Sequence, residues 1–228
     1  MTTPDDALAA RFGIPDSPVA AAARRLTYDV SPEFVYNHAI RSYLFARELS
    51  ALEETPEHGD DELLFLTCVL HDLGATEYAS TDQRFEMDGA DAAAKFLQAQ
   101  GVDVARVDAA WTAIALHTSV GLAHRFGSIA AVAQMGIGAD ILGTHRQQLP
   151  EGFADRVHAA WPRHDLGYAL ASVIAEQAHR NPAKAPPMSF PAHLHELMYP
   201  AQSSATWLDL VDAAGWNDRP VAVTGSQS

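Results

Sequence analysis

Two histidines and two aspartates interrupt apolar helical patterns in three segments of this chain. His71 and Asp72 are adjacent at the end of the apolar run LTCVLHD. His38 lies near the apolar stripe of an amphipathic segment, and Asp140 interrupts a segment that is apolar nearly all round. Burying an imidazole or a carboxylate is costly unless the group is paired or bound. These four residues therefore predict a binding partner inside the protein.

Two imidazoles and two carboxylates form a ligand set that is typical of a divalent transition metal. Such ions bind neutral imidazole nitrogens and carboxylate oxygens at about 2.0 to 2.2 Å. We expect one ion, held by His38, His71, Asp72 and Asp140. Zn²⁺ fits this set most readily, and Fe²⁺ or Mn²⁺ fit it as well. With water at an open position, the centre would be catalytic.

Each of these residues also has a purely structural interpretation. A single inward histidine such as His38 is often a hydrogen-bonded core residue, and Asp140 could pair with a buried arginine. The His-Asp dipeptide occurs by chance too, because the chain contains a second one at His164 and Asp165. The second pair follows Trp-Pro-Arg and no apolar helix, so we expect it at the surface.

Helices must carry these side chains, because no segment of any length alternates with the period of a strand. Ser31 is a candidate N-cap with Pro32 at the first helical position, and Gly74 predicts the end of the helix that carries the His-Asp pair. We expect helices over residues 19–26, 32–52, 62–72, 86–101, 103–117, 127–143, 154–180 with a break near Pro162, and 206–215. Residues 53–62 form a polar turn, and the Pro-rich stretch 181–196 is a connector.

Composition and length predict one all-α domain. The chain has 228 residues, of which 48% are hydrophobic and 19% are charged, enough for a sizeable core. We expect an N-terminal arm with a short helix at 1–30, a single helical domain at 31–216 and a disordered tail at 217–228. The oligomeric state is open, because the last helix, with Trp207, Leu208 and Trp216, could serve a homo-oligomer interface as well as a core.

Charge and the termini limit the partners. The net charge of −14 repels a phosphate backbone, so we expect a small neutral or cationic substrate and no nucleic acid. No apolar stretch approaches the roughly 20 residues of a membrane span, and the N-terminus lacks a signal pattern. These features predict a cytoplasmic protein without a membrane partner. Cys68, the only cysteine, fits a reducing compartment, and we expect it in the core.

The order of the four residues resembles the metal-ligand signature of the HD-domain superfamily, which reads H, then HD, then D. The segments SPEFVYNHAIRSYLFARELS, LLFLTCVLHDLGATEYA, RFEMDGADAAAKFL and ALHTSVGLAHRFG resemble the cyanamide hydratase-like branch, over roughly residues 15 to 145. This resemblance implies an HD-domain helical bundle. It also implies a lyase that hydrates a nitrile-like carbon at a metal centre, with cyanamide giving urea.

A hydration of this kind needs a proton donor as well as a metal. A metal can lower the pKa of its water to about 7, and the nitrile nitrogen must then gain protons from a group within about 2.6 to 3.2 Å. Glu86, His117 and Thr118 are the candidates. His117 could instead bind the metal or orient a ligand, and Glu86 could be only a charge at a helix N-terminus.

Two other enzyme classes and a non-catalytic module remain open. A nucleotide phosphohydrolase needs basic groups near the metal, and Ala75 stands where phosphohydrolases of the superfamily often place a lysine. A dinuclear-iron oxygenase needs a second metal. Glu86 and His117, together with either His124 or His145, could provide its ligands. A regulatory module would keep the ligands and lack the substrate pocket.

Two sets of residues distinguish these alternatives. The basic residues that a phosphohydrolase could use are Arg41, Arg84, Lys95 and Arg125. The residues that we expect to form the walls of a hydratase pocket are Phe34, Phe85, Met87 and Trp111.

Overall fold

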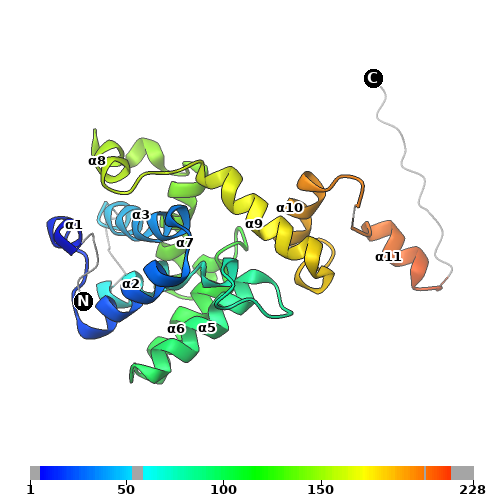
Figure 1. Ribbon diagram of the computed structural model, residues 1–228, viewed down its shortest axis with the longest axis horizontal. Coiled ribbons are helices and arrows are strands. Elements are labelled where there is room, and N and C mark those ends of the chain that lie inside the picture. Colours follow the sequence, from blue (N-terminus) through cyan, green and yellow to red (C-terminus); the bar gives the residue numbers. More distant parts are fainter. Residues whose placement is uncertain (1–5, 53–58, 203, 217–228) are drawn as a thin grey trace.

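The computed structural model describes residues 6–52, 59–202 and 204–216. Over these residues the chain forms eleven α-helices and four short 3-10 helices, with no strand (Figure 1). The all-α prediction is therefore confirmed. The helices are α1 (Asp6–Arg11), α2 (Pro18–Val30), α3 (Glu33–Ser50), α4 (Asp61–Leu70), α5 (Phe85–Ala99), α6 (Val104–Leu116), α7 (Ser128–Leu142), α8 (Phe153–Ala160), α9 (Leu166–Arg180), α10 (Phe190–Met198) and α11 (Trp207–Ala213).

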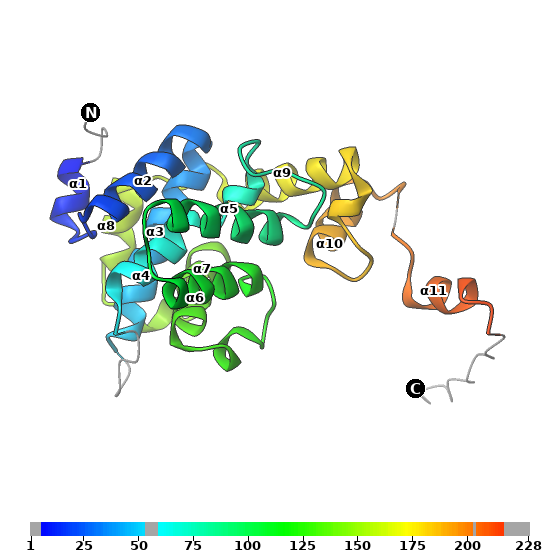
Figure 2. The ribbon, with the colours of Figure 1, turned by 90° about the horizontal axis from the view of Figure 1, so that it is seen from below.

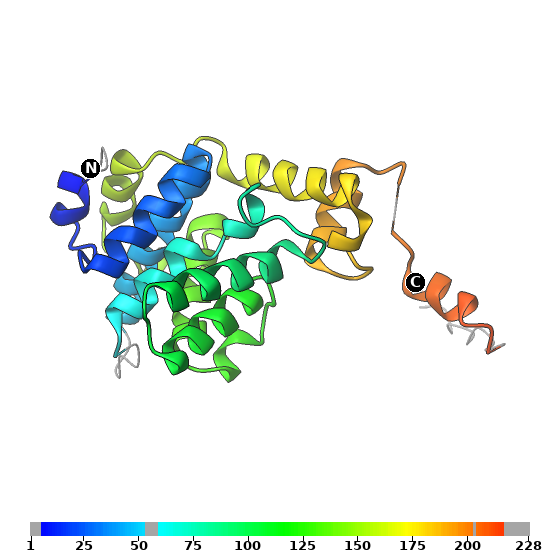
Figure 3. The same ribbon diagram turned by 60° about the horizontal axis from the view of Figure 1, so that its bottom comes forward.

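The centre of the fold is the pair α3 and α7, which pack along each other. Helix α4 lies against both of them and against α2 and α6, while α5 and α6 pack side by side (Figure 3). Because α4 is enclosed on all sides, every residue from Leu63 to Leu70 is buried, and Cys68 is a core residue as expected. Helix α9 leaves this bundle with α10 packed against it (Figure 2).

Local signals explain where the helix that carries the His-Asp pair begins and ends. Asp60 caps α4 by accepting a hydrogen bond from the Leu63 backbone nitrogen at 2.9 Å. The helix ends at Leu70, earlier than Gly74, and the 3-10 helix η1 (Leu73–Ala75) follows. A Cβ on Gly74 would come within 2.7 Å of the Gly89 backbone nitrogen. The glycine is therefore needed for close packing of η1 on α5, not for ending α4.

Two other segments differ from the sequence expectations. Helix α1 lies in the predicted arm, and residues 181–196 contain η4 (Pro182–Lys184) and most of α10, which Ser189 caps. The predicted break near Pro162 is confirmed, because α8 ends at Ala160 and α9 begins at Leu166, and His164 and Asp165 between them adopt positive φ angles of 47° and 57°. The predicted tail at 217–228 and most of the turn at 53–62 lie outside the described residues.

The last helix, α11, stands away from the rest of the chain (Figure 3). Trp207, Leu208 and Trp216 are 63%, 70% and 83% exposed, so they form no part of the core. Their use in a homo-oligomer interface stays a prediction. Of the helices in the described ranges, none is both long enough and apolar enough to cross a bilayer.

A glycine allows α3 and α7 to approach closely at the level of the candidate site. Gly136 of α7 faces the α3 backbone, and a Cβ there would collide with the Ser42 carbonyl oxygen and lie 2.6 Å from the Ala46 nitrogen. Gly136 lies one turn before Asp140, and Ser42 one turn after His38. This contact therefore sets the separation of the two elements that carry His38 and Asp140.

We expect Gly136→Ala to destabilise the protein by about 1 to 3 kcal/mol or more, because the added methyl group overpacks a rigid helix contact. Gly167→Ala in α9 is the matched control, since nothing lies within 4 Å of its added Cβ. The control should be neutral or slightly stabilising. Urea unfolding curves of both variants measure the difference, and equal midpoints would contradict the close contact.

Candidate metal centre

His38, His71 and Asp72 lie together in the interior of the bundle. One potential ligand atom from each residue lies within 4.8 Å of the others, and all three side chains are buried. His38 comes from the middle of α3. His71 is the C-cap of α4, and Asp72 leaves the helical conformation with φ −100° and ψ 16°. This break explains how two adjacent side chains converge on one point, which a regular helix would prevent.

His117 joins this group from α6. Its Nε2 lies 3.7 Å from Asp72 Oδ1, while the Nε2 atoms of His71 and His38 lie 3.2 and 3.7 Å from Asp72 Oδ2. Neighbouring imidazoles meet edge to face, with centroids 5.0 Å apart for His38 and His71 and for His71 and His117. Three imidazole nitrogens therefore surround one carboxylate.

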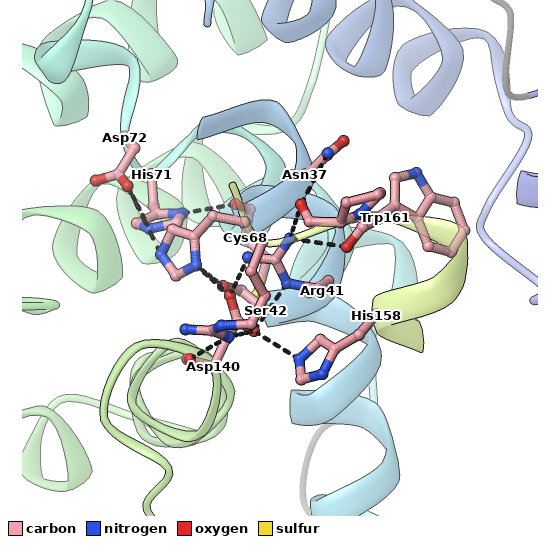
Figure 4. A network of polar contacts seen from close by, with 12 residues as sticks. Asn37, Arg41, Ser42, Cys68, His71, Asp72, Asp140, His158 and Trp161 are labelled. Atoms are coloured by element: carbon pink, nitrogen blue, oxygen red, sulfur yellow. Dashed lines mark hydrogen bonds and ion pairs between the residues drawn. The ribbon is translucent and has the colours of Figure 1, made fainter. Parts of the chain in front are cut away.

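The opposite ring nitrogens fix the histidine tautomers. Nδ1 of His71 donates to the Cys68 carbonyl oxygen and Nδ1 of His117 to the Ile114 carbonyl oxygen, both at 2.7 Å (Figure 4 shows the first). Carbonyl oxygens only accept, so each Nδ1 carries a hydrogen, and in the neutral imidazole the lone pair is then on Nε2. This is the tautomer that binds a metal through Nε2.

Several polar atoms of the cluster have no hydrogen bond within the described part of the chain. They are His71 Nε2 and both carboxylate oxygens of Asp72, although His71 Nε2 forms a 3.2 Å ion-pair contact with Asp72 Oδ2. A buried polar atom without a partner costs about 1 to 3 kcal/mol. Lone pairs on imidazole nitrogens beside a bare carboxylate are the donors that a divalent transition metal prefers, so the residues present fit such an ion.

The electrostatics also favour a cation at this point. Burial would raise the pKa of Asp72, but His71, His38 and His117 hold that pKa well below its usual range, so the carboxylate is charged. Burial lowers the pKa of His38 in spite of Asp140. Burial and the neighbouring His71 lower the pKa of His117 to about 4. For His71, burial is outweighed by Asp72, which raises the pKa.

Asp140 lies on the far side of His38 from Asp72. Its Oδ2 accepts a hydrogen bond from His38 Nδ1 at 2.7 Å, and its two oxygens accept bonds from Arg41 Nε and Nη2 at 2.9 and 2.8 Å (Figure 4). Arg163 Nη1 lies 2.8 Å from Oδ1. Burial would raise the pKa of Asp140, but its bonds with His158, His38 and Arg41 lower it.

In this arrangement Asp140 bonds His38 on the side away from Asp72, while His117 Nε2 lies 3.7 Å from Asp72 Oδ1. Direct binding of a metal by Asp140 would require its bonds with Arg41 and Arg163 to rearrange. Arg41 also donates to the carbonyl oxygens of Trp161 and Pro162, both at 3.0 Å, and so ties the segment after α8 to the centre. The alternative of a buried arginine partner for Asp140 is thus present in the structure.

Glu86 and Thr118 form a second polar pair beside the cluster. Thr118 Oγ1 donates to Glu86 Oε1 at 2.6 Å, Arg84 forms an ion pair with the same oxygen, and Glu86 Oε2 has no hydrogen bond among the described residues. Glu86 lies in the first turn of α5 but is fully buried, which an ordinary helix-terminal charge is not. Thr118 faces the cavity, and Glu86 lies behind it.

A cavity of about 450 Å³ opens onto the cluster. His38, His71, Asp72, His117 and Thr118 line one part of it. Of the predicted walls only Phe85 lines it, and Trp111 instead bonds Asp91 through its indole nitrogen at 2.8 Å. The other lining residues are Val120, Ala131, Gln134, Met135, Ile137, Gly138, Ile141, Leu142, Thr144, His145, Leu170, Ile174 and Phe190.

The remaining candidates from the sequence do not assemble. Among the residues described, no lysine or arginine lines the cavity, because Arg41 is engaged by Asp140 and Arg84 by Glu86. His145 lines the cavity and His124 does not, and no second group of metal ligands is found in the described ranges. The pair at His164 and Asp165 is exposed, as expected.

The chain matches no known protein-family model and no curated protein sequence. Its resemblance to HD-domain proteins stays a prediction that rests on the four sequence segments. The position of His117 beside Asp72 did not follow from the sequence spacing. One signal could have indicated it, because TCVLH and TAIALH both place a histidine at the C-cap of an apolar helix.

We expect His71→Ala and Asp72→Ala to lose the bound metal, because each removes a group at the point where the ligands meet. His117→Ala should weaken binding at least tenfold. His164→Ala, in the exposed His-Asp pair, is the matched control and should keep one metal per chain. Elemental analysis of the purified variants measures this, and full metal content in Asp72→Ala would disprove the site.

Metal should also stabilise the fold, because it binds polar atoms that are otherwise unpaired in the interior. Adding Zn²⁺, Fe²⁺ or Mn²⁺ to chelator-treated protein should raise the Tm by several degrees. The shift should be absent from Asp72→Ala and present in His164→Ala. Differential scanning calorimetry provides the measurement, and an equal shift in both variants would indicate surface binding.

Proposed function

We propose that this protein is a metal-dependent hydro-lyase that adds water to a small, uncharged substrate with a nitrile-like carbon. Cyanamide, which would give urea, is the simplest such substrate. The observation that carries the proposal is the convergence of three imidazoles and one carboxylate at a largely apolar cavity whose described lining has no lysine or arginine. We propose that the centre belongs to an HD-type bundle.

His38, His71, Asp72 and His117 would hold the metal. A bound divalent ion supplies a Lewis acid and lowers the pKa of a coordinated water to about 7. The bonds of the three Nδ1 atoms to Asp140, Cys68 and Ile114 keep the imidazoles oriented. The protein thus provides ligands that need little rearrangement to bind.

Thr118 and Glu86 would transfer protons to and from the substrate. Hydration forms a carbon–oxygen bond, and both hydrogens of the water end on nitrogen once the product has tautomerised to the amide or urea. The Thr118 hydroxyl faces the cavity and donates to Glu86 Oε1, so it can pass a proton between the substrate and that carboxylate. Because burial and His71 lower the pKa of His117, that imidazole is neutral at pH 7 and suits a ligand better than an acid.

The cavity lining makes a phosphohydrolase a weaker proposal. A phosphate group in this cavity would meet the Asp72 carboxylate without a guanidinium or ammonium group to offset its charge. A dinuclear oxygenase is weaker too, since the described residues hold a single group of ligands. A non-catalytic module does not need a cavity over its metal ligands.

Thr118→Val and Glu86→Gln should each lower kcat for cyanamide hydration by roughly 10²-fold, the lower end of what a positioned proton donor contributes. Both variants should keep their metal, because neither side chain is a ligand. Ser119→Ala, next to Thr118 and outside the cavity lining, is the control and should have wild-type activity.

Urea release from cyanamide and phosphate release from nucleoside monophosphates should be measured on the same metal-loaded protein. Urea release that a chelator abolishes and that Asp72→Ala lacks would support the proposal. Phosphate release without urea release, or two metals per chain, would overturn it.

A further inference from the structure

The cavity is much larger than cyanamide requires. Its volume of about 450 Å³ equals the bulk-liquid share of roughly 15 water molecules, at about 30 Å³ each. Cyanamide has three non-hydrogen atoms and would leave most of that space unfilled. Close packing around the ligand is the rule in binding sites, so the cavity fits a substrate with an additional group.

The metal-binding residues and Thr118 line one part of the cavity, and the remaining lining is mostly apolar apart from Gln134, Thr144 and His145. The metal-binding residues and Thr118 come from α3, from the end of α4 with the residue after it, and from the end of α6. Gln134 is polar, but its Nε2 already donates to the carbonyl oxygens of Leu116, His117 and Ser119 at 3.3, 3.2 and 3.1 Å. The apolar lining comes mainly from α7, α9 and α10, with Met135, Ile137, Ile141, Leu170, Ile174 and Phe190.

Several residues of this apolar lining are held in place by packing in the core. Leu170 and Ile174 are buried in a cluster with Phe85, and Ile141 packs against the same cluster. Phe190 is 39% exposed and its ring lies 6.3 Å from that of Phe85. Phe85 and Phe190 thus provide an aromatic part of the wall beside the branched aliphatic side chains, while the lining residues Val120 and Leu142 are mostly exposed to solvent. An apolar group on the substrate would find a preformed site.

We infer that the substrate carries an apolar group about the size of a phenyl ring on its nitrile-like function, and that α7, α9 and α10 select this group. The inference rests on the proposed hydratase function and names its substrate class. The reacting carbon lies at the imidazole cluster, and the apolar group lies against Ile141, Leu170 and Phe190. The segments that follow α7, which the sequence resemblance leaves out, thereby determine specificity.

The first test compares substrates on the metal-loaded protein. N-phenylcyanamide should be hydrated to N-phenylurea with a kcat/KM at least 10²-fold above that for cyanamide, because each buried methylene equivalent is worth roughly tenfold or more. An equal or higher kcat/KM for cyanamide would overturn the inference and leave the hydratase proposal intact.

The second test measures binding without turnover. N-phenylurea, the product of that reaction, should bind wild-type protein in isothermal titration calorimetry, and unsubstituted urea should bind at least tenfold more weakly. Ala131→Phe, which adds a ring at a lining residue, and Phe190→Ala, which removes one, should each weaken N-phenylurea binding at least tenfold. Both variants should retain one metal per chain.

Ala105→Phe is the control, because this residue is exposed near the start of α6 and outside the cavity lining; it should bind N-phenylurea as wild type does. If N-phenylurea binds and both lining variants weaken it while neither cyanamide nor N-phenylcyanamide is hydrated, the apolar site stands and the hydratase proposal fails. If N-phenylurea binds no better than urea, or if the lining variants bind it like Ala105→Phe, the inference fails.

Discussion

The buried carboxylate of Asp72 is the constraint around which the centre of this protein is arranged. Three imidazole nitrogens lie within 3.7 Å of its oxygens, and neither oxygen accepts a hydrogen bond from the described residues. A charge in that position is stable only if a positive group meets it. The surrounding histidines are held by their other nitrogens, so their Nε2 atoms are the positions at which a metal would bind. The cluster thus has the form of a metal site.

The helices that carry this cluster are held together by features that look unrelated to it. Gly136 lets α7 reach the backbone of α3, and one turn further Asp140 bonds His38 and Arg41. Gly74 lets η1 reach α5, just after Asp72 and close to where Glu86 begins its helix. A Cβ at either glycine would collide with the backbone of the neighbouring element. The close packing of the helices therefore also sets the positions of the site residues.

The proposed chemistry divides the protein into two parts with different tasks. The helices up to α6 provide the ligands, the Thr118 hydroxyl and the Glu86 carboxylate behind it. The helices from α7 onward add Asp140, which orients His38, and most of the apolar cavity lining. Evolution of a new substrate preference could alter Leu170, Ile174 or Phe190 without touching a ligand. A fold can support different functions in this way when the residues that bind the substrate are separate from those that do the chemistry.

The sequence by itself determined most of the helices, because apolar spacing and terminal residues such as Asp60 are local signals. It did not reveal α1 or α10, and the Pro-rich stretch that contains the start of α10 was predicted to be a connector. It also determined that His38, His71 and Asp72 face inward, since polar residues interrupt otherwise apolar faces. Only the tertiary structure decided that His117 meets Asp72 and that Asp140 lies behind His38, because residues 45 and 102 positions apart are brought together by packing and not by spacing. The cavity walls depend in the same way on how α9 and α10 return to the bundle, so Phe34, Met87 and Trp111 could not be excluded from it by pattern alone.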